Sequence, residues 1–236
     1  NTIRYLLTWE AVEHEGPGRY DQEFIDYTVE VLKIIHKVGG VYVFLEFHQD
    51  VWLRFLGGSG APLWTFYAAG LEPKRFAVTE AAILHNQRKF KNEEYPKMLW
   101  VSNYNRLASF VMFTLFFSGD LYFPDLRINN LNVKEYLQTM FFNMEKFLWR
   151  QLTKKLHAMI EDGTLMGFEL MNEPNCGLVG RENLAEFPDA IQLRVDSTPS
   201  PFQTIKLGLG IACELDIYRI SVTGPLKQGT RTVNPK

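Results

Sequence analysis

The chain has 236 residues and a formal net charge of −2, with 46% hydrophobic and 22% charged residues. This balance is typical of one large globular domain and excludes a disordered or fibrous chain. Because the charge is almost balanced, no basic field is available for a phosphate backbone, and we expect no nucleic-acid partner. Cys176 and Cys213 are too few for a disulfide framework or for a structural zinc site.

The sequence also indicates whether the chain spans a membrane and where in the cell it is expected. The longest apolar run, residues 107–117, has about eleven residues, whereas a membrane-spanning helix needs about twenty. The sequence contains no Asn-x-Ser/Thr acceptor, which favours an intracellular protein of the cytoplasm or the vacuole. Residue 1 already lies in a strand-like run without a preceding Met, so we expect a piece of a longer protein.

Strand and helix patterns alternate in the first 50 residues. Residues 2–9 are strand-like, and Asp21 precedes a helix whose apolar residues recur at helical spacing. Gly39 and Gly40 end this helix, and residues 41–45 are β-branched and aromatic, as in a buried parallel strand. The order strand, helix, strand predicts a parallel β-α-β unit.

A long stretch from about 50 to 130 follows, which we interpret as an insertion after the second strand. It has loop signals at 57–62 and predicts a helix over 98–117. Aromatic residues gather between Trp52 and Phe142. They indicate a large core or, as a second interpretation, rings that line a concave site for a sugar or a flat apolar ligand.

The clearest predicted helix begins after Asn132, which is an N-cap with Glu135 three residues on. Its apolar stripe continues to Leu156, and Gly163 ends it. Residues 165–171 predict a third strand, whereas 196–201 predict an exposed loop. Three strands are too few for a closed (β/α)8 barrel, which has eight.

Two carboxylates lie near the end of the third strand, Glu169 and Glu173. They share a face but are separated by about 13 Å along the strand. Retaining glycoside hydrolysis needs two carboxyl groups about 5–5.5 Å apart, so Glu173 can be only one member of such a pair. A lone Glu at a strand end is more often a capping or solvent group. Asn172, which can hold a sugar 2-hydroxyl, and Pro174, which stiffens the exit, favour the catalytic interpretation.

The second strand ends in alternate polar residues, Glu46, His48 and Asp50, which point the same way. They could bind sugar hydroxyls or a metal, but a metal lacks a third ligand at suitable spacing. Arg4 lies in the first strand, where a buried charge needs a partner. That partner is either Glu169 or the catalytic carboxylates.

The other polar signals are assigned no role. The glycine-rich run 57–60 lacks the Gly-Lys-Ser/Thr of a nucleotide site, so we expect no nucleotide to bind there. The remaining histidines fall in turns or helices: His14, His36, His85 and His157.

Five motifs together resemble glycoside hydrolase family 5, and more narrowly its fungal intracellular glucocerebrosidase and steryl-β-glucosidase branch. They are Leu-Thr-Trp-Glu at 7–10, Gly-Pro-Gly-Arg-Tyr-Asp at 16–21, His-Gln-Asp-Val-Trp at 48–52, Gly-Gly-Ser-Gly-Ala-Pro-Leu-Trp at 57–64 and Asn-Glu-Pro at 172–174. The resemblance covers nearly the whole chain. It implies an α/β fold, a (β/α)8 TIM barrel truncated at both ends, with 1–236 a partial catalytic domain.

The resemblance also implies residue roles. Glu173 would be the general acid/base, Asn172 would contact the sugar 2-hydroxyl, and His48 and Asp50 would contact other glucose hydroxyls. Arg4 would support the nucleophile. The family nucleophile is a Glu at the end of the seventh strand, to which nothing here can be matched, so we expect the isolated chain to be inactive.

The sequence departs from the family pattern at two places. Glu46 and Phe47 stand where the family has Asp-Pro, and Leu53 and Leu56 stand where serines are expected. These changes bear on the loop conformation more than on the chemistry.

The implied function is hydrolysis of a glucosyl lipid, glucosylceramide or ergosteryl β-glucoside, with no cofactor and no obligate protein partner. The insertion would cover the lipid or touch the membrane surface that presents it. Two alternatives stay open: an inactive fragment or pseudoenzyme that binds a glycoside, and a β-glucan-cleaving endoglucanase of the same family.

Overall fold

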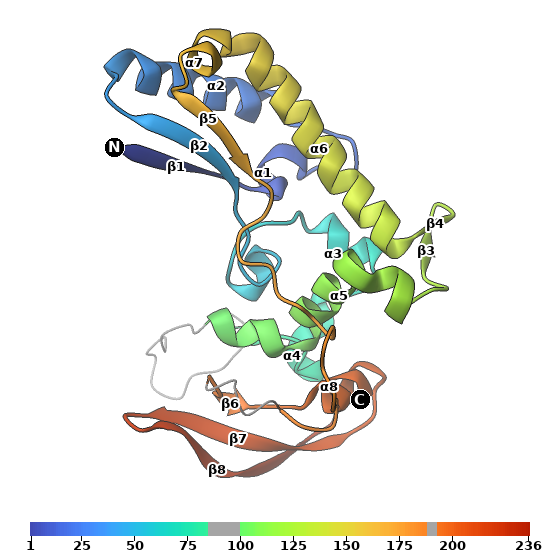
Figure 1. Ribbon diagram of the computed structural model, residues 1–236. Coiled ribbons are helices and arrows are strands. Elements are labelled where there is room, and N and C mark those ends of the chain that lie inside the picture. Colours follow the sequence, from blue (N-terminus) through green and yellow to red (C-terminus); the bar gives the residue numbers. More distant parts are fainter. Residues whose placement is uncertain (85–99, 188–192) are drawn as a thin grey trace.

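The computed structural model describes residues 1–84, 100–187 and 193–236, and one end of it is a three-stranded parallel sheet in the order β1-β2-β5 (Figure 1). The strands are β1 (Thr2–Leu7), β2 (Tyr42–Phe47) and β5 (Leu165–Glu169). Helices α1 (Trp9–Glu13) and α2 (Gln22–Val38) connect β1 to β2, and α6 (Val133–Lys155) and α7 (His157–Glu161) lead into β5. The predicted parallel β-α-β arrangement is present, although the first strand ends at Leu7 and Trp9 begins α1.

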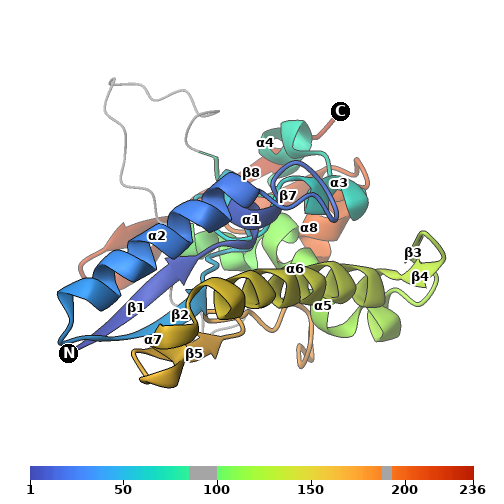
Figure 2. The ribbon, with the colours of Figure 1, turned by 90° about the horizontal axis from the view of Figure 1, so that it is seen from above.

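Helices α2 and α6 lie side by side over one face of this sheet (Figure 2). The Asp21 carboxylate accepts a hydrogen bond of 2.8 Å from the Phe24 N–H and so caps α2 as predicted. Gly39, with φ of 72°, ends the helix. The inner face of α2 buries apolar residues, including Ile25 and Leu32, against the sheet.

Helix α6 is shorter than the predicted element. Asn132 caps it by accepting a hydrogen bond of 2.9 Å from the Lys134 N–H. The prediction of a helix ending at Gly163 was wrong, because Leu156 leaves the helical conformation, with φ of −121° and ψ of 29°. The short helix α7 follows, and Gly163, with φ of 77°, comes after α7.

In its described residues, the segment between β2 and α6 has mainly helical elements. Its elements are η1 (Arg54–Leu56), α3 (Trp64–Ala68), η2 (Pro73–Arg75), α4 (Phe76–Thr79), η4 (Trp100–Asn105), α5 (Leu107–Tyr122), and the strands β3 (Arg127–Ile128) and β4 (Leu131–Asn132). The helix predicted over 98–117 begins only at Leu107, after the 3-10 turn η4, and it continues to Tyr122 across a kink at Ser118. Residues 98 and 99 lie outside the described residues.

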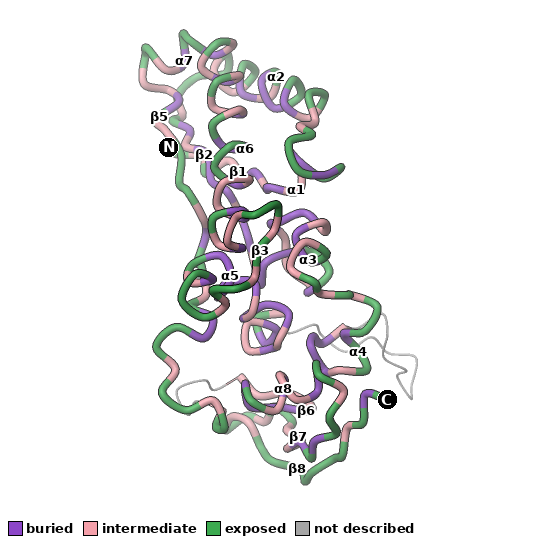
Figure 3. Tube along the Cα trace, turned by 90° about the vertical axis from the view of Figure 1, so that its right-hand side faces the viewer, coloured by how far each residue is buried: buried purple, intermediate pink, exposed green. Residues whose placement is uncertain are grey.

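A second, antiparallel sheet in the order β6-β7-β8 lies at the other end of the molecule (Figure 1). Its elements are β6 (Asp196–Ser197), α8 (Pro201–Gly208), β7 (Cys213–Ser221) and β8 (Gly224–Val233). The prediction of an exposed loop over 196–201 was wrong, because Ser197, Thr198 and Ser200 are buried. The Ser200 hydroxyl and the Gln203 side chain form a capping box that begins α8. Strand β8 is mostly exposed (Figure 3).

Glu80 connects this second sheet to the segment between β2 and α6. Its carboxylate accepts a hydrogen bond of 2.6 Å from the Ser197 hydroxyl and pairs with Arg231 at 2.7 Å and with Arg106 at 3.4 Å. Only 7% of Glu80 is exposed, so these partners offset the cost of burying its charge.

One apolar core runs from the parallel sheet into the helical segment. Trp52 is 2% exposed, and its ring packs edge-on against Phe113, with centroids 5.4 Å apart. The Trp9 ring contacts Trp52 and Phe141 in the same manner. These rings are therefore core, which favours the first interpretation of the aromatic residues. Among the described residues, none of the helices combines the length and apolar character that crossing a bilayer requires.

Candidate active site

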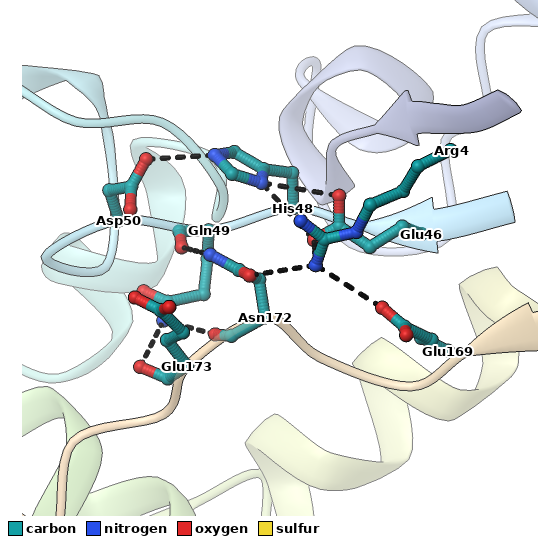
Figure 4. Close-up of polar contacts among 8 residues, drawn as sticks. All are labelled: Arg4, Glu46, His48, Gln49, Asp50, Glu169, Asn172 and Glu173. Carbon is teal, nitrogen blue, oxygen red and sulfur yellow. Dashed lines mark hydrogen bonds and ion pairs between the residues drawn. The ribbon is translucent and has the colours of Figure 1, made fainter.

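The predicted polar residues of the second strand lie together at its carboxyl end (Figure 4). The His48 imidazole lies between two carboxylates, with Nδ1 3.1 Å from Glu46 Oε1 and Nε2 2.8 Å from Asp50 Oδ2. The ring therefore joins the two carboxyl groups through hydrogen bonds. The Glu46 side chain is fully buried, whereas those of His48 and Asp50 keep 21% and 17% of their surface open to solvent.

Arg4 links β1 to β2 and to the end of β5. Its Nη2 donates to Asn172 Oδ1 at 2.9 Å and pairs with Glu46 Oε1 at 3.3 Å and Glu169 Oε2 at 3.2 Å. The predicted pair with Glu169 is thus present. The expectation of a buried Arg4 charge was wrong, because 43% of the side chain is exposed. In the described part of the chain the sheet stops at β1, so one side of the guanidinium meets solvent.

The Asn-Glu-Pro segment leaves β5 and passes beneath the end of β2. The Asn172 N–H donates to Phe47 O at 3.1 Å, and the Asn172 amide donates to Gln49 O at 3.0 Å. Asn172 is 7% exposed, whereas Glu173 is exposed and its carboxylate makes no hydrogen bond or ion pair with the described residues. The backbone of Glu173 has φ of 33°, a strained value for a residue with a side chain.

The glycine-rich loop packs directly on the end of β2. A Cβ on Gly58 would lie 2.1 Å from the Asp50 carbonyl oxygen, and one on Gly60 would lie 2.6 Å from Gln49 Cβ. Only glycine permits this approach. The Asp50 N–H donates to Ser59 O at 2.9 Å, which closes the loop over the site. The motif therefore has a structural role that its sequence did not reveal.

The structure brings together all five predicted site residues: His48, Asp50, Asn172 and Glu173 follow the carboxyl ends of β2 and β5, and Arg4 reaches them from within β1 (Figure 4). Sequence reasoning missed Gln49, whose amide contacts Asn172 and Glu173. Its position between His48 and Asp50 in a strand-end motif was the available signal.

Three of the histidines that were assigned no role have their contacts away from this cluster. His36 Nε2 contacts Asp162 at 2.7 Å, and His157 and His14 contact Glu161 and Asp21 on the surface. His85 lies outside the described residues. In residues 1–84, 100–187 and 193–236, no group of three or more His, Cys, Asp or Glu side chains is arranged to hold a metal ion.

The chain is similar in sequence to curated fungal proteins. No protein-family model matches the chain. An ergosteryl-β-glucosidase of Saccharomyces cerevisiae is 47% identical over 246 residues, which cover 100% of this chain and 32% of that protein. A glucosylceramidase of Aspergillus fumigatus is 46% identical over 239 residues, which cover 100% of this chain and 31% of that protein.

A solved structure agrees with these relatives. The crystal structure of Cryptococcus neoformans sterylglucosidase 1 superposes on the chain with a TM-score of 0.93 at 37% identity, covering 100% of this chain and 33% of that one. The resemblance inferred from the motifs is thus confirmed. Over its whole length the chain is a homologue of the fungal steryl-β-glucosidases and glucosylceramidases, and it spans about a third of their length.

Proposed function

We propose that the intact protein is a retaining glycoside hydrolase that cleaves the bond between a β-glucosyl group and a lipid, either ceramide or ergosterol. The names of the relatives support the substrate class. Residues 1–236 would be a partial catalytic domain with an insertion at about 50–130, and β1, β2 and β5 would be three strands of a (β/α)8 barrel. Active sites of such barrels lie at the carboxyl ends of the strands, where the cluster lies here.

The observation that carries the proposal is the exposed Glu173 carboxylate, which has no polar partner among the described residues, beside a cluster of hydrogen-bonded polar side chains. A general acid/base must reach the glycosidic oxygen, and an exposed carboxylate at a strand end is free to do so. In the proposed mechanism Glu173 protonates the leaving oxygen and then activates water. The nucleophile would be a residue of the intact protein other than residues 1–236.

The other residues would hold the sugar. The Asn172 amide uses one N–H on Gln49 and one lone pair on Arg4, so one N–H and one lone pair remain for a 2-hydroxyl. His48 and Asp50 hold each other in place, and their exposed edges would bind other glucose hydroxyls. Arg4 retains exposed N–H groups that would support the nucleophile.

The acid/base role is tested by Glu173→Gln in the intact enzyme. We expect kcat/KM for an alkyl β-glucoside, which has a poor leaving group, to fall by about 10²–10⁴-fold. The matched control is Glu182→Gln, which alters an exposed carboxylate on the same loop and should leave kcat/KM unchanged. An unchanged rate in Glu173→Gln would refute the assignment.

The substrate and the two alternatives have their own assays. Hydrolysis of a glucosyl lipid but not of a β-glucan, measured side by side, would support the proposed substrate over the endoglucanase alternative. The 236-residue chain alone should not turn over a chromogenic β-glucoside, and turnover would contradict the proposal that the nucleophile lies elsewhere. Intracellular location, the membrane contact of the insertion and the lack of a nucleic-acid partner remain predictions.

A further inference from the structure

Gln49 lies in the centre of the candidate site, yet its side chain points away from the face that His48 and Asp50 share (Figure 4). It is 5% exposed. Its Nε2 donates to Asn172 O at 2.6 Å and to Glu173 O at 3.1 Å, and its Oε1 accepts from the Trp52 N–H at 3.1 Å. The Gln49 amide therefore joins the end of β2 to the segment that carries Glu173.

Glutamine suits these contacts better than the residues nearest to it in shape. Two carbonyl oxygens require two donors and one N–H requires an acceptor, and the carboxamide supplies both. This pattern also fixes which end of the amide is nitrogen. A glutamate would place acceptors against two carbonyls, and a methionine would supply no donor, so each leaves buried polar groups without partners.

The segments that Gln49 joins are strained. Glu173 has φ of 33° and Trp52 has φ of 86°, and both are residues with large side chains in the left-handed region. Strained backbone persists only where surrounding contacts hold it. At these two residues Gln49 supplies such contacts from one side chain.

Neighbouring groups keep Gln49 itself in place. The Gly60 backbone lies so close that an added Cβ would come within 2.6 Å of Gln49 Cβ. The Asn172 amide returns a hydrogen bond of 3.0 Å to the Gln49 carbonyl. Gly60 and Asn172 thus restrict the position of Gln49.

We propose that Gln49 is a positioning residue, which holds the backbone of Asn172 and Glu173 so that the Glu173 carboxyl is directed at the glycosidic oxygen. This inference rests on the proposed acid/base role of Glu173. Because Gln49 is buried, it would contact neither the substrate nor the reacting atoms. Its loss should therefore weaken proton donation rather than sugar binding.

The test compares two glucosides in the intact enzyme. An alkyl β-glucoside needs a proton on its leaving oxygen, whereas a 2,4-dinitrophenyl β-glucoside leaves without one. In Gln49→Met we expect kcat/KM for the alkyl glucoside to fall about 10–100-fold, because a misplaced Glu173 carboxyl donates its proton to the leaving oxygen less efficiently. For the dinitrophenyl glucoside it should change by less than about threefold. Gln49→Glu, which keeps the size of the side chain and the acceptor for Trp52, should separate the substrates in the same way.

Two further variants serve as controls for a general loss of stability and for an effect that does not act through Glu173. Asn103 is also a buried amide that bonds backbone groups, at Leu56 and Ile83, but it does not contact Asn172 or Glu173. Asn103→Leu should lower Tm and leave the ratio of the two substrates unchanged. In Glu173→Gln the added Gln49→Met change should cause no further loss on the alkyl glucoside.

The possible outcomes distinguish failure of the Gln49 positioning role from failure of the Glu173 acid/base role. If both Gln49 variants slow the two substrates equally, as a merely structural change would, the positioning role is overturned. If Glu173→Gln separates the substrates and neither Gln49 variant does, only this inference fails. If Glu173→Gln treats both substrates alike, the proposed acid/base role itself is wrong.

Discussion

Glu145 is a buried carboxyl group, and its burial makes the stability of the fold depend on pH. It lies on the inner side of α6, in a small cavity with Leu45, Phe168 and Trp149 among the lining residues. Only 6% of it is exposed, and its Oε1 has no hydrogen-bond partner in the described structure. Burial raises the pKa of Glu145 from 4.5 to about 8.

The sign of the effect follows from proton binding. Since the pKa is higher in the folded chain, the folded state keeps a proton that the unfolded state has lost between pH 4.5 and about 8. Stability therefore falls as pH rises through this window and becomes level above it. At about pH 7 the loss is about 3 kcal/mol, and at about pH 5 it is below about 1 kcal/mol.

Glu145→Gln keeps the shape of the side chain and removes its titration. We expect the intact variant to match the wild type in unfolding free energy near pH 5, and to exceed it by about 2–3 kcal/mol near pH 7. Urea unfolding at both pH values measures this difference. The control is Glu30→Gln, an exposed surface change on α2 that should alter stability by less than about 0.5 kcal/mol. Equal pH dependence in Glu145→Gln and wild type would refute the reasoning.

Two further predictions concern packing and charge. Gly60→Ala should lower stability by about 2 kcal/mol or more in thermal unfolding, because its Cβ would clash and its φ is 133°; Gly18→Ala, with open space around it, should cost less. Glu80→Gln should cost about 3 kcal/mol and speed hydrogen exchange in β7 and β8, since Arg106 would lose a buried charge partner. Asp216→Asn, which breaks an exposed pair with Lys227, should cost below about 1 kcal/mol. Equal costs within either pair would contradict these accounts.

Local signals made the first half of the fold predictable. Asp21 and Asn132 cap helices through bonds within three residues, so their roles are visible in the sequence. The hairpin of β7 and β8 escaped prediction because β8 is polar and mostly exposed, and it lacks the alternation that marks a strand. Ser197 was expected at the surface because polar residues usually are, but its partner Glu80 lies 117 residues away.

The candidate site was predictable to a similar extent. Alternation along β2 brought Glu46, His48 and Asp50 onto one face, which spacing alone predicts. Gln49 has the opposite orientation, and its partners are 123 and 124 residues away. The strand-end motif could have marked Gln49 as a candidate, but no local pattern predicts partners so far away in the sequence. The break at Leu156 was also invisible, because leucine is a good helix former.

The distance in sequence between β2 and β5 also has a consequence for biosynthesis. At about 5–20 residues per second, the roughly 120 residues between Gln49 and Asn172 take about 6–25 s to translate. During that interval the edge of β2 that later pairs with β5 offers unpaired backbone groups and apolar side chains such as Val43. Wrong pairing with another nascent chain is most probable then, and a chaperone that binds extended apolar segments would protect this edge until β5 emerges from the ribosome.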